Sequence, residues 1–302
     1  MVRPAESRDF GFAKHSWTVC FDDEPRFIDW NFEYNYTAAD TLIAEAEGEP
    51  AAIMQCKPRK VNLNGTAAAA HYISGVATMP EFRRRGLVRK LFEYALPFMY
   101  KRGGCVSYLI SAVGDMYKKF GYTTVGQRCV YKTDGVGAEI IRCGGEACAQ
   151  LNDLYLNRAE NCIMYEIRDK RTWDKLLTEL LEISGGCILS SPSAYAMAYK
   201  SGDEYEVYEQ CGSMPIRLEG LESAPIMARI TNIEEFLSIF PEIFSADEVI
   251  TVSDVLVPEN NGSFRLIGGR AVRCDDEGKK YDISELCARA FRGSEVLIET
   301  TV

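Results

Sequence analysis

Histidine and paired cysteines are scarce in this sequence. It has only two histidines, His15 and His71, and its eleven cysteines are scattered without a Cys-x-x-Cys pair. The first residues lack the apolar core of a signal peptide, so we expect the thiols to be reduced and packed in cores. The sequence therefore predicts neither a disulfide frame nor a zinc site, and no metal cofactor.

Long apolar runs and an excess of positive charge are also missing. No apolar stretch approaches the roughly 18 residues that a membrane-spanning helix needs. The 34 basic residues are outnumbered by 44 acidic ones, which gives a formal net charge of −10. Nonspecific nucleic-acid binding needs a basic surface, whereas an acidic protein attracts cationic small molecules and amines. We expect a cytoplasmic protein that binds neither a membrane nor a nucleic acid.

The chain does contain enough apolar material for more than one domain. With 302 residues, 47% of them hydrophobic, it suits two or three globular domains. Strand-like and helix-like runs both recur along it, so the predicted fold class is α/β (α+β). A glycine-rich stretch begins near residue 133, and a strand leading into a helix begins near residue 225. We therefore divide the chain into residues 1–132, 133–222 and 223–302.

A basic turn organises the first of these units. Residues 67–77 read as a strand, apolar residues recur at helical spacing from Leu87 onward, and Arg83-Arg84-Arg85-Gly86 lies between them. Arginines at a helix N-terminus are repelled by the partial positive charge of its free amide groups. A phosphate or pyrophosphate bound on the turn would explain them, with Gly86 letting the backbone approach it closely. The alternative is a solvated arginine cluster at a helix end.

An aromatic-rich stretch precedes the basic turn, at residues 25–36. We favour a helix packed on a sheet, because large aromatic side chains are mostly buried. The alternative is the wall of an acceptor pocket, in which aromatic faces together with Asp29 and Glu33 would hold a cation.

The run Arg83-Arg84-Arg85-Gly86-Leu87-Val88 resembles the Arg/Gln-x-x-Gly-x-Gly/Ala turn of the GNAT N-acetyltransferases, which binds the pyrophosphate of coenzyme A. Val88 departs from that pattern, and the segment looks more specifically like the enhanced-intracellular-survival (Eis) branch. The run Tyr117-Lys118-Lys119-Phe120-Gly121-Tyr122 resembles the end of the GNAT core. The resemblance implies an N-acetyltransferase that uses acetyl-CoA as co-substrate and acetylates a primary amine of a small cationic or peptide-like acceptor.

The resemblance also implies which residues bind the cofactor. One group would pair with the pantetheine arm, a second would hold the pyrophosphate, and a third would lie beside the cofactor. In this order they are Val76, Ala77 and Thr78; Arg84, Arg85, Gly86, Leu87, Val88 and Arg89; and Ala112 and Val113.

Two catalytic groups follow from the same resemblance. Acyl transfer from a thioester to an amine needs a neutral amine and an acid for the departing thiolate. A phenol in hydrogen-bond reach of the sulfur can be that acid, and Tyr117 occupies this position of the motif; the alternative is a core tyrosine. The base implied by the family is the C-terminal carboxylate, here that of Val302, with Glu299 as the rival carboxylate.

For the whole chain the resemblance implies an N-terminal GNAT fold, a shortened GNAT-like second unit without a cofactor, and a C-terminal unit like sterol carrier proteins. It implies a homo-oligomer, with a hexamer as the usual assembly of the family. Two other functions stay open. One is a non-catalytic acyl-CoA-binding sensor. The other is a transferase that uses aminoacyl-tRNA, against which the acidic charge argues.

Overall fold

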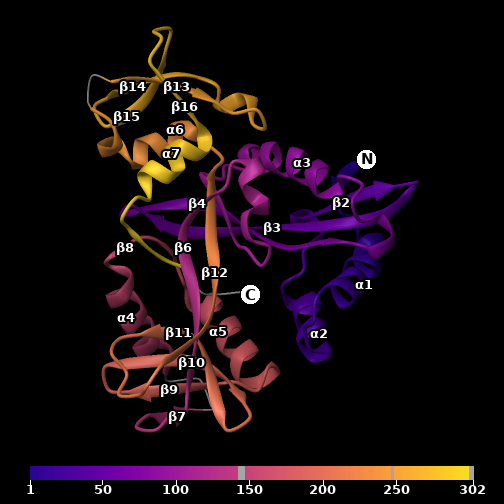
Figure 1. Cartoon of the computed structure of the whole chain (residues 1–302), viewed down its shortest axis with the longest axis vertical. Helices are drawn as coiled ribbons and strands as arrows, with labels where there is room; N and C mark the ends of the chain where they lie inside the picture. Colours follow the sequence, from indigo (N-terminus) through magenta and orange to yellow (C-terminus); the bar gives the residue numbers. More distant parts are fainter. Residues whose placement is uncertain (142–146, 246–247, 299–302) are drawn as a thin grey trace.

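A computed structural model describes residues 1–141, 147–245 and 248–298. Within these residues the chain forms a 13-stranded sheet and a separate 4-stranded sheet, with helices packed against both (Figure 1). The fold is therefore mixed α/β. No helix in the described ranges is long and apolar enough to cross a membrane.

The large sheet begins with consecutive antiparallel strands. β1 (Val2–Pro4), β2 (Thr41–Ala46), β3 (Glu49–Leu63) and β4 (Thr66–Thr78) pair in this order. Asn64 and Gly65 form the turn between the last two with φ of 49° and 79°, the left-handed geometry that tight hairpins favour. The sequence pattern predicts strands at residues 41–47, 51–56 and 67–78, with turns at residues 48–50 and at Asn64-Gly65. The structure confirms three strands and the Asn64-Gly65 turn, but β3 already begins at Glu49 and continues to Leu63.

Helix α3 (Leu87–Lys101) follows the basic turn and covers β2, β3 and β4. Its apolar stripe is buried in one core cluster with those strands. The sequence predicted that Pro97 kinks this helix or ends it near Ala95. The end near Ala95 is wrong, because the helix continues to Lys101. The prediction rested on Pro97 lying within the apolar helical pattern, because proline cannot donate the backbone hydrogen bond of a helix. Leu96 and Met99 are fully buried on either side of Pro97, and this packing outweighs the lost hydrogen bond.

Helices α1 (Phe10–Cys20) and α2 (Pro25–Tyr34) lie on the other side of the strands. Trp17, Ile28 and Phe32 form a core cluster with β2, β3 and β4 residues. The prediction that the aromatic stretch is a helix packed on a sheet is therefore confirmed. Asp29 is paired with Lys14 at 2.7 Å.

A strand from late in the sequence joins the N-terminal part of the sheet. β5 (Val106–Ile110) does not pair with β6 (Thr123–Thr133), because β12 (Glu219–Ile230) lies between them. β6 continues into the pairing with β11 (Glu204–Cys211), after which come β10 (Ala194–Ser201), β9 (Cys187–Ser191) and β7 (Glu139–Ile141). One sheet thus runs through both halves of the chain (Figure 1). The division at residues 132 and 222 stays a prediction.

The middle of the chain adds a helical layer to this sheet. It contains α4 (Ala147–Ala159), α5 (Lys170–Leu177) and a π-helical turn, Thr178–Ile183. β8 (Cys162–Glu166) pairs with β3 and with β17 (Glu295–Leu297). The apolar residues 296–302 predict a buried tail. For Val296, Leu297 and Ile298 this is confirmed, because they are at most 8% exposed. Val302 and Glu299 lie outside the described residues.

The 4-stranded sheet stands at the top of Figure 1. It consists of β13 (Val249–Ser253), β14 (Gly262–Ile267), β15 (Arg270–Cys274) and β16 (Lys279–Asp282). Helices α6 (Ile233–Ile239) and α7 (Ile283–Ala290) lie between it and the large sheet. A single apolar cluster includes residues from both sheets and both helices. This shared core fixes the C-terminal unit against β12.

Candidate active site

Two neighbouring strands separate within the N-terminal part of the large sheet. β4 and β5 run parallel, and their ladder has three residue pairs, of which the last joins Tyr72 and Tyr108. Beyond it, β4 stays paired with β3 up to Thr78, whereas β5 stays paired with β12. A strand edge that loses its neighbour leaves backbone N–H and C=O groups unpaired. Residues 73–76 of β4 and the end of β5 line a cavity at this point.

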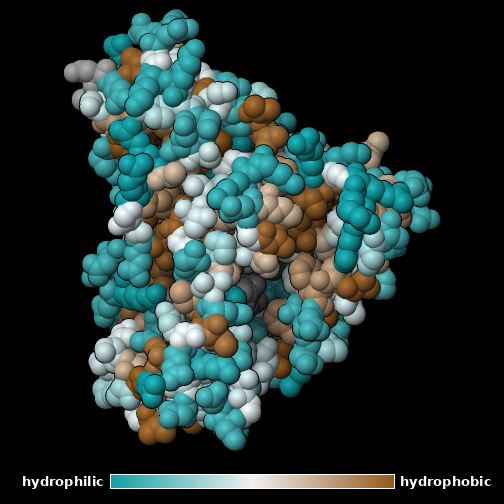
Figure 2. All heavy atoms as spheres, in the orientation of Figure 1, coloured by the Kyte–Doolittle hydropathy of each residue, from teal (hydrophilic) through white to brown (hydrophobic). Residues whose placement is uncertain are grey.

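This cavity, the central cavity, has a volume of about 840 Å³. Its first wall is the pair of separated strands, and its second is Trp17, Phe21 and Phe27 from α1 and α2. Its third wall comes from the middle of the chain, at residues between 176 and 209. Figure 2 shows the surface hollowed between the α1–α2 part and the part built by β9–β11. A volume of this size holds a small organic molecule.

Tyr117 faces the central cavity from a 3-10 helix, Gly114–Phe120. It is 8% exposed, and its ring packs against Phe92 and Tyr122 with centroids 5.6 and 6.3 Å away. Burial raises the pKa of the Tyr117 phenol, so the group keeps its proton at neutral pH. Its hydroxyl makes no hydrogen bond to another residue in the described part of the chain. The proton is therefore available to a ligand.

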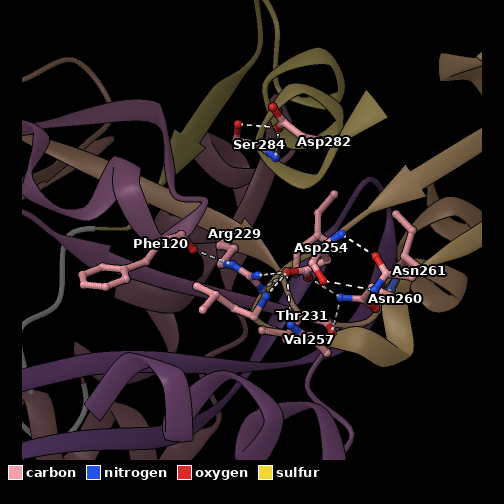
Figure 3. A network of polar contacts seen from close by, with 12 residues as sticks. Phe120, Arg229, Thr231, Asp254, Val257, Asn260, Asn261, Asp282 and Ser284 are labelled. Atoms are coloured by element: carbon pink, nitrogen blue, oxygen red, sulfur yellow. Dashed lines mark hydrogen bonds and ion pairs between the residues drawn. The ribbon is translucent and has the colours of Figure 1, made fainter. Parts of the chain in front are cut away.

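A buried ion pair from the C-terminal half holds this 3-10 helix (Figure 3). Arg229 of β12 is 1% exposed, and its Nη2 lies 2.6 Å from Asp254 Oδ1. Its Nε donates to the carbonyl oxygen of Phe120 at 2.7 Å. Gly121 ends the helix with φ of 83°, and a Cβ there would lie 3.0 Å from Arg229 Nε. The closing turn of the tyrosine motif therefore rests directly on the guanidinium.

Glu179 supplies a buried carboxylate to the third wall. It is 3% exposed and accepts hydrogen bonds from Ser184 Oγ at 2.5 Å and from the Tyr199 hydroxyl at 3.0 Å. Burial raises the pKa of Glu179, and the charge of Asp23 adds to this, while the two hydroxyl donors oppose it. No cation of the described chain forms an ion pair with it. A buried carboxylate without a counter-charge is typical of a ligand site.

Glu179 was not predicted as a site residue from the sequence. The feature that could have identified it is an acid on the apolar face of α5 and the turn that follows, three residues after Leu176. The acids proposed from the aromatic stretch, Asp29 and Glu33, do not line the central cavity. Three consecutive acids before α2 do: Asp22, Asp23 and Glu24. Asp23 is held there by the Trp17 indole at 2.8 Å.

The basic turn has the geometry of an open helix N-terminus. Arg84 and Gly86 have left-handed φ of 62° and 74°, and Gly86 is the N-cap of α3. Arg84 and Arg89 are exposed without an ion pair to a described residue, whereas Arg85 contacts Glu47 at 2.5 Å. The amide groups at the start of α3 have no partner within the helix, so the turn presents cations and free N–H groups together.

The residues predicted to bind the cofactor fall into two places. Val76, Ala112 and Val113 line the central cavity together with Tyr117. Ala77 is 3% exposed in the core beneath α1, and the Thr78 carbonyl oxygen accepts from Arg83 Nε at 3.2 Å. Those outside the cavity lining are Ala77, Thr78, Arg84, Arg85, Gly86, Leu87, Val88 and Arg89.

Comparisons with known proteins agree with this arrangement. Residues 1–125 match the family model described as the acetyltransferase (GNAT) domain. No curated protein matches the chain.

Three solved structures share the fold over nearly the whole length. A GCN5-related N-acetyltransferase from Anabaena variabilis has a TM-score of 0.73 at 15% identity, covering 95% of this chain and 89% of its own. A probable N-acyltransferase from Enterococcus faecalis has a TM-score of 0.73 at 18% identity, with 95% and 88% covered. Eis1 from Mycobacterium abscessus has a TM-score of 0.69 at 15% identity, with 97% and 90% covered. Residues 1–125 of this chain therefore match a GNAT acetyltransferase domain, within a mixed α/β fold that the chain shares with these three proteins.

Proposed function

We propose that this protein transfers the acetyl group of acetyl-CoA to a primary amine of a small cationic or peptide-like acceptor. The observation that carries the proposal is the composition of the central cavity. There an open strand edge, a protonated tyrosine and the uncompensated carboxylate of Glu179 meet. An acyl transferase needs a place for the thioester, an acid for its sulfur and a site for the amine.

In this proposal acetyl-CoA lies along the separated strands. Val76, Ala77 and Thr78 lie on the strand edge toward the pantetheine arm, and Ala112 and Val113 lie beside it. The pyrophosphate binds the exposed start of α3, where Arg84, Arg85 and Arg89 supply charge and the amides of Gly86, Leu87 and Val88 supply donors. The exposed arginines and the 15-residue helix behind them support this placement.

Replacing Arg84 and Arg85 together with alanine tests the basic turn. Each charge-assisted hydrogen bond contributes about 1.5–3 kcal/mol, so we expect acetyl-CoA to bind weaker by a few kcal/mol in total. Calorimetry of the full chain measures this. Lys90→Ala is the matched control, because Lys90 is an exposed cation on the same helix outside the proposed set. Equal affinities of the double variant and wild type would exclude the turn as the phosphate site.

In the proposed chemical step, each proton transfer is assigned to a residue. The neutral amine attacks the thioester carbonyl, and the C–S bond breaks as Tyr117 donates its proton to the departing thiolate. The proton of the attacking nitrogen goes to a carboxylate, for which we propose the C-terminal group of Val302, with Glu299 as the rival. Both residues lie outside the described ranges, so this assignment rests on the sequence resemblance alone.

Glu179→Gln tests the amine site. The change keeps the shape of the side chain but removes the charge that would hold an acceptor ammonium. We expect kcat/KM for the acceptor to fall by about 10- to 100-fold, with acetyl-CoA affinity unchanged. Glu182→Gln is the matched control, because Glu182 is exposed on the same turn and does not line the cavity. A loss no larger than that of the control would remove Glu179 from the site.

The same variant should change how the stability of the protein depends on pH. Because the folded-state pKa of Glu179 is raised, the folded protein binds more protons than the unfolded chain, and stability falls as pH rises through that pKa. Glu179→Gln removes this penalty. The difference in Tm, variant minus wild type, should therefore be more positive at pH 8 than at pH 4.

We also infer an Eis-type arrangement of the chain, with a catalytic GNAT unit, a shortened GNAT-like unit and a C-terminal unit like sterol carrier proteins. The likeness to Eis1 over 97% of this chain supports it, as does the separate small sheet packed on α6 and α7.

A thiol-release screen tests the proposed function. Wild-type protein is incubated with acetyl-CoA and a broad panel of amines, and free thiol is followed. We expect release that depends on both the amine and intact Arg84 and Arg85. Binding of acetyl-CoA without amine-dependent release would contradict the transferase and leave an acyl-CoA-binding sensor.

A further inference from the structure

We propose that the acceptor carries a carboxylate as well as its amine, and that Arg128 binds this carboxylate in the central cavity. The inference rests on the proposed function, because the same cavity holds the amine. It names the acceptor class as amino acids and the C-terminal residues of short peptides.

Arg128 lines the cavity and forms no ion pair within the described part of the chain. It lies on β6 opposite Ala224 of β12. Its Nε is buried and has no hydrogen-bond partner among the described residues, and its guanidinium forms no ion pair with any of them. The guanidinium stacks on the Tyr208 ring, whose centroid lies 5.4 Å from Cζ. In a chain with ten more acidic than basic residues, an arginine left unpaired in a cavity favours an anionic ligand group.

The acids near Arg128 do not form an ion pair with it. Glu209 lines the cavity but is held by Arg168, whose two Nη atoms lie 2.7 and 2.5 Å from its carboxylate oxygens. Glu206 accepts from the Tyr208 hydroxyl at 3.4 Å. Glu222 is exposed. No ion pair joins Arg128 to any of these three acids, so among the described residues its charge is left for a molecule in the cavity.

One chain of contacts joins Arg128 to Glu179. Tyr199 donates to Glu179 Oε2 at 3.0 Å, and its ring meets that of Tyr208 edge-on with centroids 5.2 Å apart. Tyr208 in turn lies under Arg128. The wall therefore offers a carboxylate at one end and a guanidinium at the other, with two tyrosines between them. A ligand with an ammonium and a carboxylate satisfies both ends, whereas a simple amine leaves Arg128 without an ion pair among the described residues.

The charge around Arg128 favours a carboxylate over a phosphate. Besides Glu179, the cavity lining includes the acids Asp22, Asp23 and Glu24. The lining also contains a second arginine, Arg26, which is exposed on α2. A phosphate dianion at Arg128 would still meet these acids in the lining, whereas a carboxylate carries a single charge and matches the planar guanidinium with two parallel hydrogen bonds.

Calorimetry on the full chain with bound CoA tests the proposal without needing turnover. The ligands form matched sets: L-lysine, L-lysinamide and cadaverine; L-phenylalanine, L-phenylalaninamide and phenethylamine; and glycyl-L-lysine with its amide. We expect at least one carboxylate ligand to bind about 10- to 100-fold more tightly than its amide and its decarboxylated amine. Preference for the free amino acid or for the dipeptide distinguishes the two sources of the carboxylate.

Arg128→Gln should bring the carboxylate ligand and its amide to within about threefold of each other by weakening the carboxylate ligand alone. Lys132→Gln is the matched control on the same strand, since Lys132 lies outside the cavity lining and pairs with Glu204, and it should keep the wild-type preference. The proposal is overturned if the amides bind wild type as tightly as the acids, if no carboxylate ligand binds, or if Arg128→Gln weakens acids and amides equally.

These results separate the two proposals. If carboxylate ligands bind preferentially but no amine gives thiol release, the carboxylate site at Arg128 stands and the proposed transferase activity is contradicted. If amines are acetylated equally well with and without a carboxylate, the transferase activity stands and the carboxylate site at Arg128 is contradicted.

Discussion

Tyr117→Phe is expected to lower kcat by roughly 10²–10⁴-fold while acetyl-CoA affinity stays nearly intact. The phenyl ring keeps the packing against Phe92 and Tyr122, so the variant loses the acid and little else. Because burial raises the pKa of Tyr117, the alkaline fall of kcat that belongs to this group should lie above the ordinary phenol value of about 10. That fall should disappear in the variant.

Tyr122→Phe is the matched control from the same motif. Its hydroxyl contacts Ser107 Oγ at 2.6 Å in the core and does not line the central cavity. We expect it to cost about 1 kcal/mol of stability and to change kcat by less than about threefold. If kcat of Tyr117→Phe also fell less than threefold, with chemistry shown to be rate-limiting, the acid would be another group or water.

Asp254→Ala is expected to lower the free energy of unfolding by about 3–5 kcal/mol, because it leaves Arg229 buried without its counter-charge. The loss is large since Asp254 is 3% exposed and its oxygens also accept hydrogen bonds from Leu256, Val257 and Asn260. Urea titration measures it. Asp254→Asn keeps the shape of the side chain and provides a milder variant if the alanine variant does not fold.

The surface pair Arg265–Asp276 provides the control. Its atoms lie 2.8 Å apart, but the side chains are 45% and 64% exposed, so Asp276→Ala should cost less than about 1 kcal/mol. Since Arg229 also holds the Phe120 carbonyl, Asp254→Asn should lower kcat under conditions where it is fully folded, with KM for acetyl-CoA unchanged. If Asp254→Ala lowered the free energy of unfolding no more than Asp276→Ala does, the Arg229–Asp254 pair would not hold this part of the fold.

The parts of the site that are local in sequence could be predicted from it. The basic turn links a strand to a helix directly, and Tyr117 lies in one short helix that Gly121 ends. Turn residues and apolar spacing therefore suffice to place them. The same holds for the hairpin at Asn64-Gly65 and for the start of α7, where Asp282 and Glu285 form a capping box.

The third wall of the cavity and the support of the Tyr117 helix could not be predicted. Arg229 contacts Phe120 across 109 residues of sequence. Glu179 and Tyr117 line one cavity only because β12 and β6 carry one sheet through both halves of the chain. Such contacts depend on strand order, which residue spacing does not encode. Pro97 was misjudged for a related reason, because packing of Leu96 and Met99 decides whether the helix continues.

The most direct test of the central claim follows the acetyl group itself. Acetyl-CoA labelled in the acetyl carbons is incubated with wild-type protein and an amine that gives thiol release, and the products are analysed by mass spectrometry. We predict that the label appears in an amide on the amine nitrogen, one acetyl group for each thiol released, and that Tyr117→Phe slows both together. Label that stays on CoA, or leaves as free acetate at a rate independent of the amine, would contradict the assignment of this protein as an amine acetyltransferase.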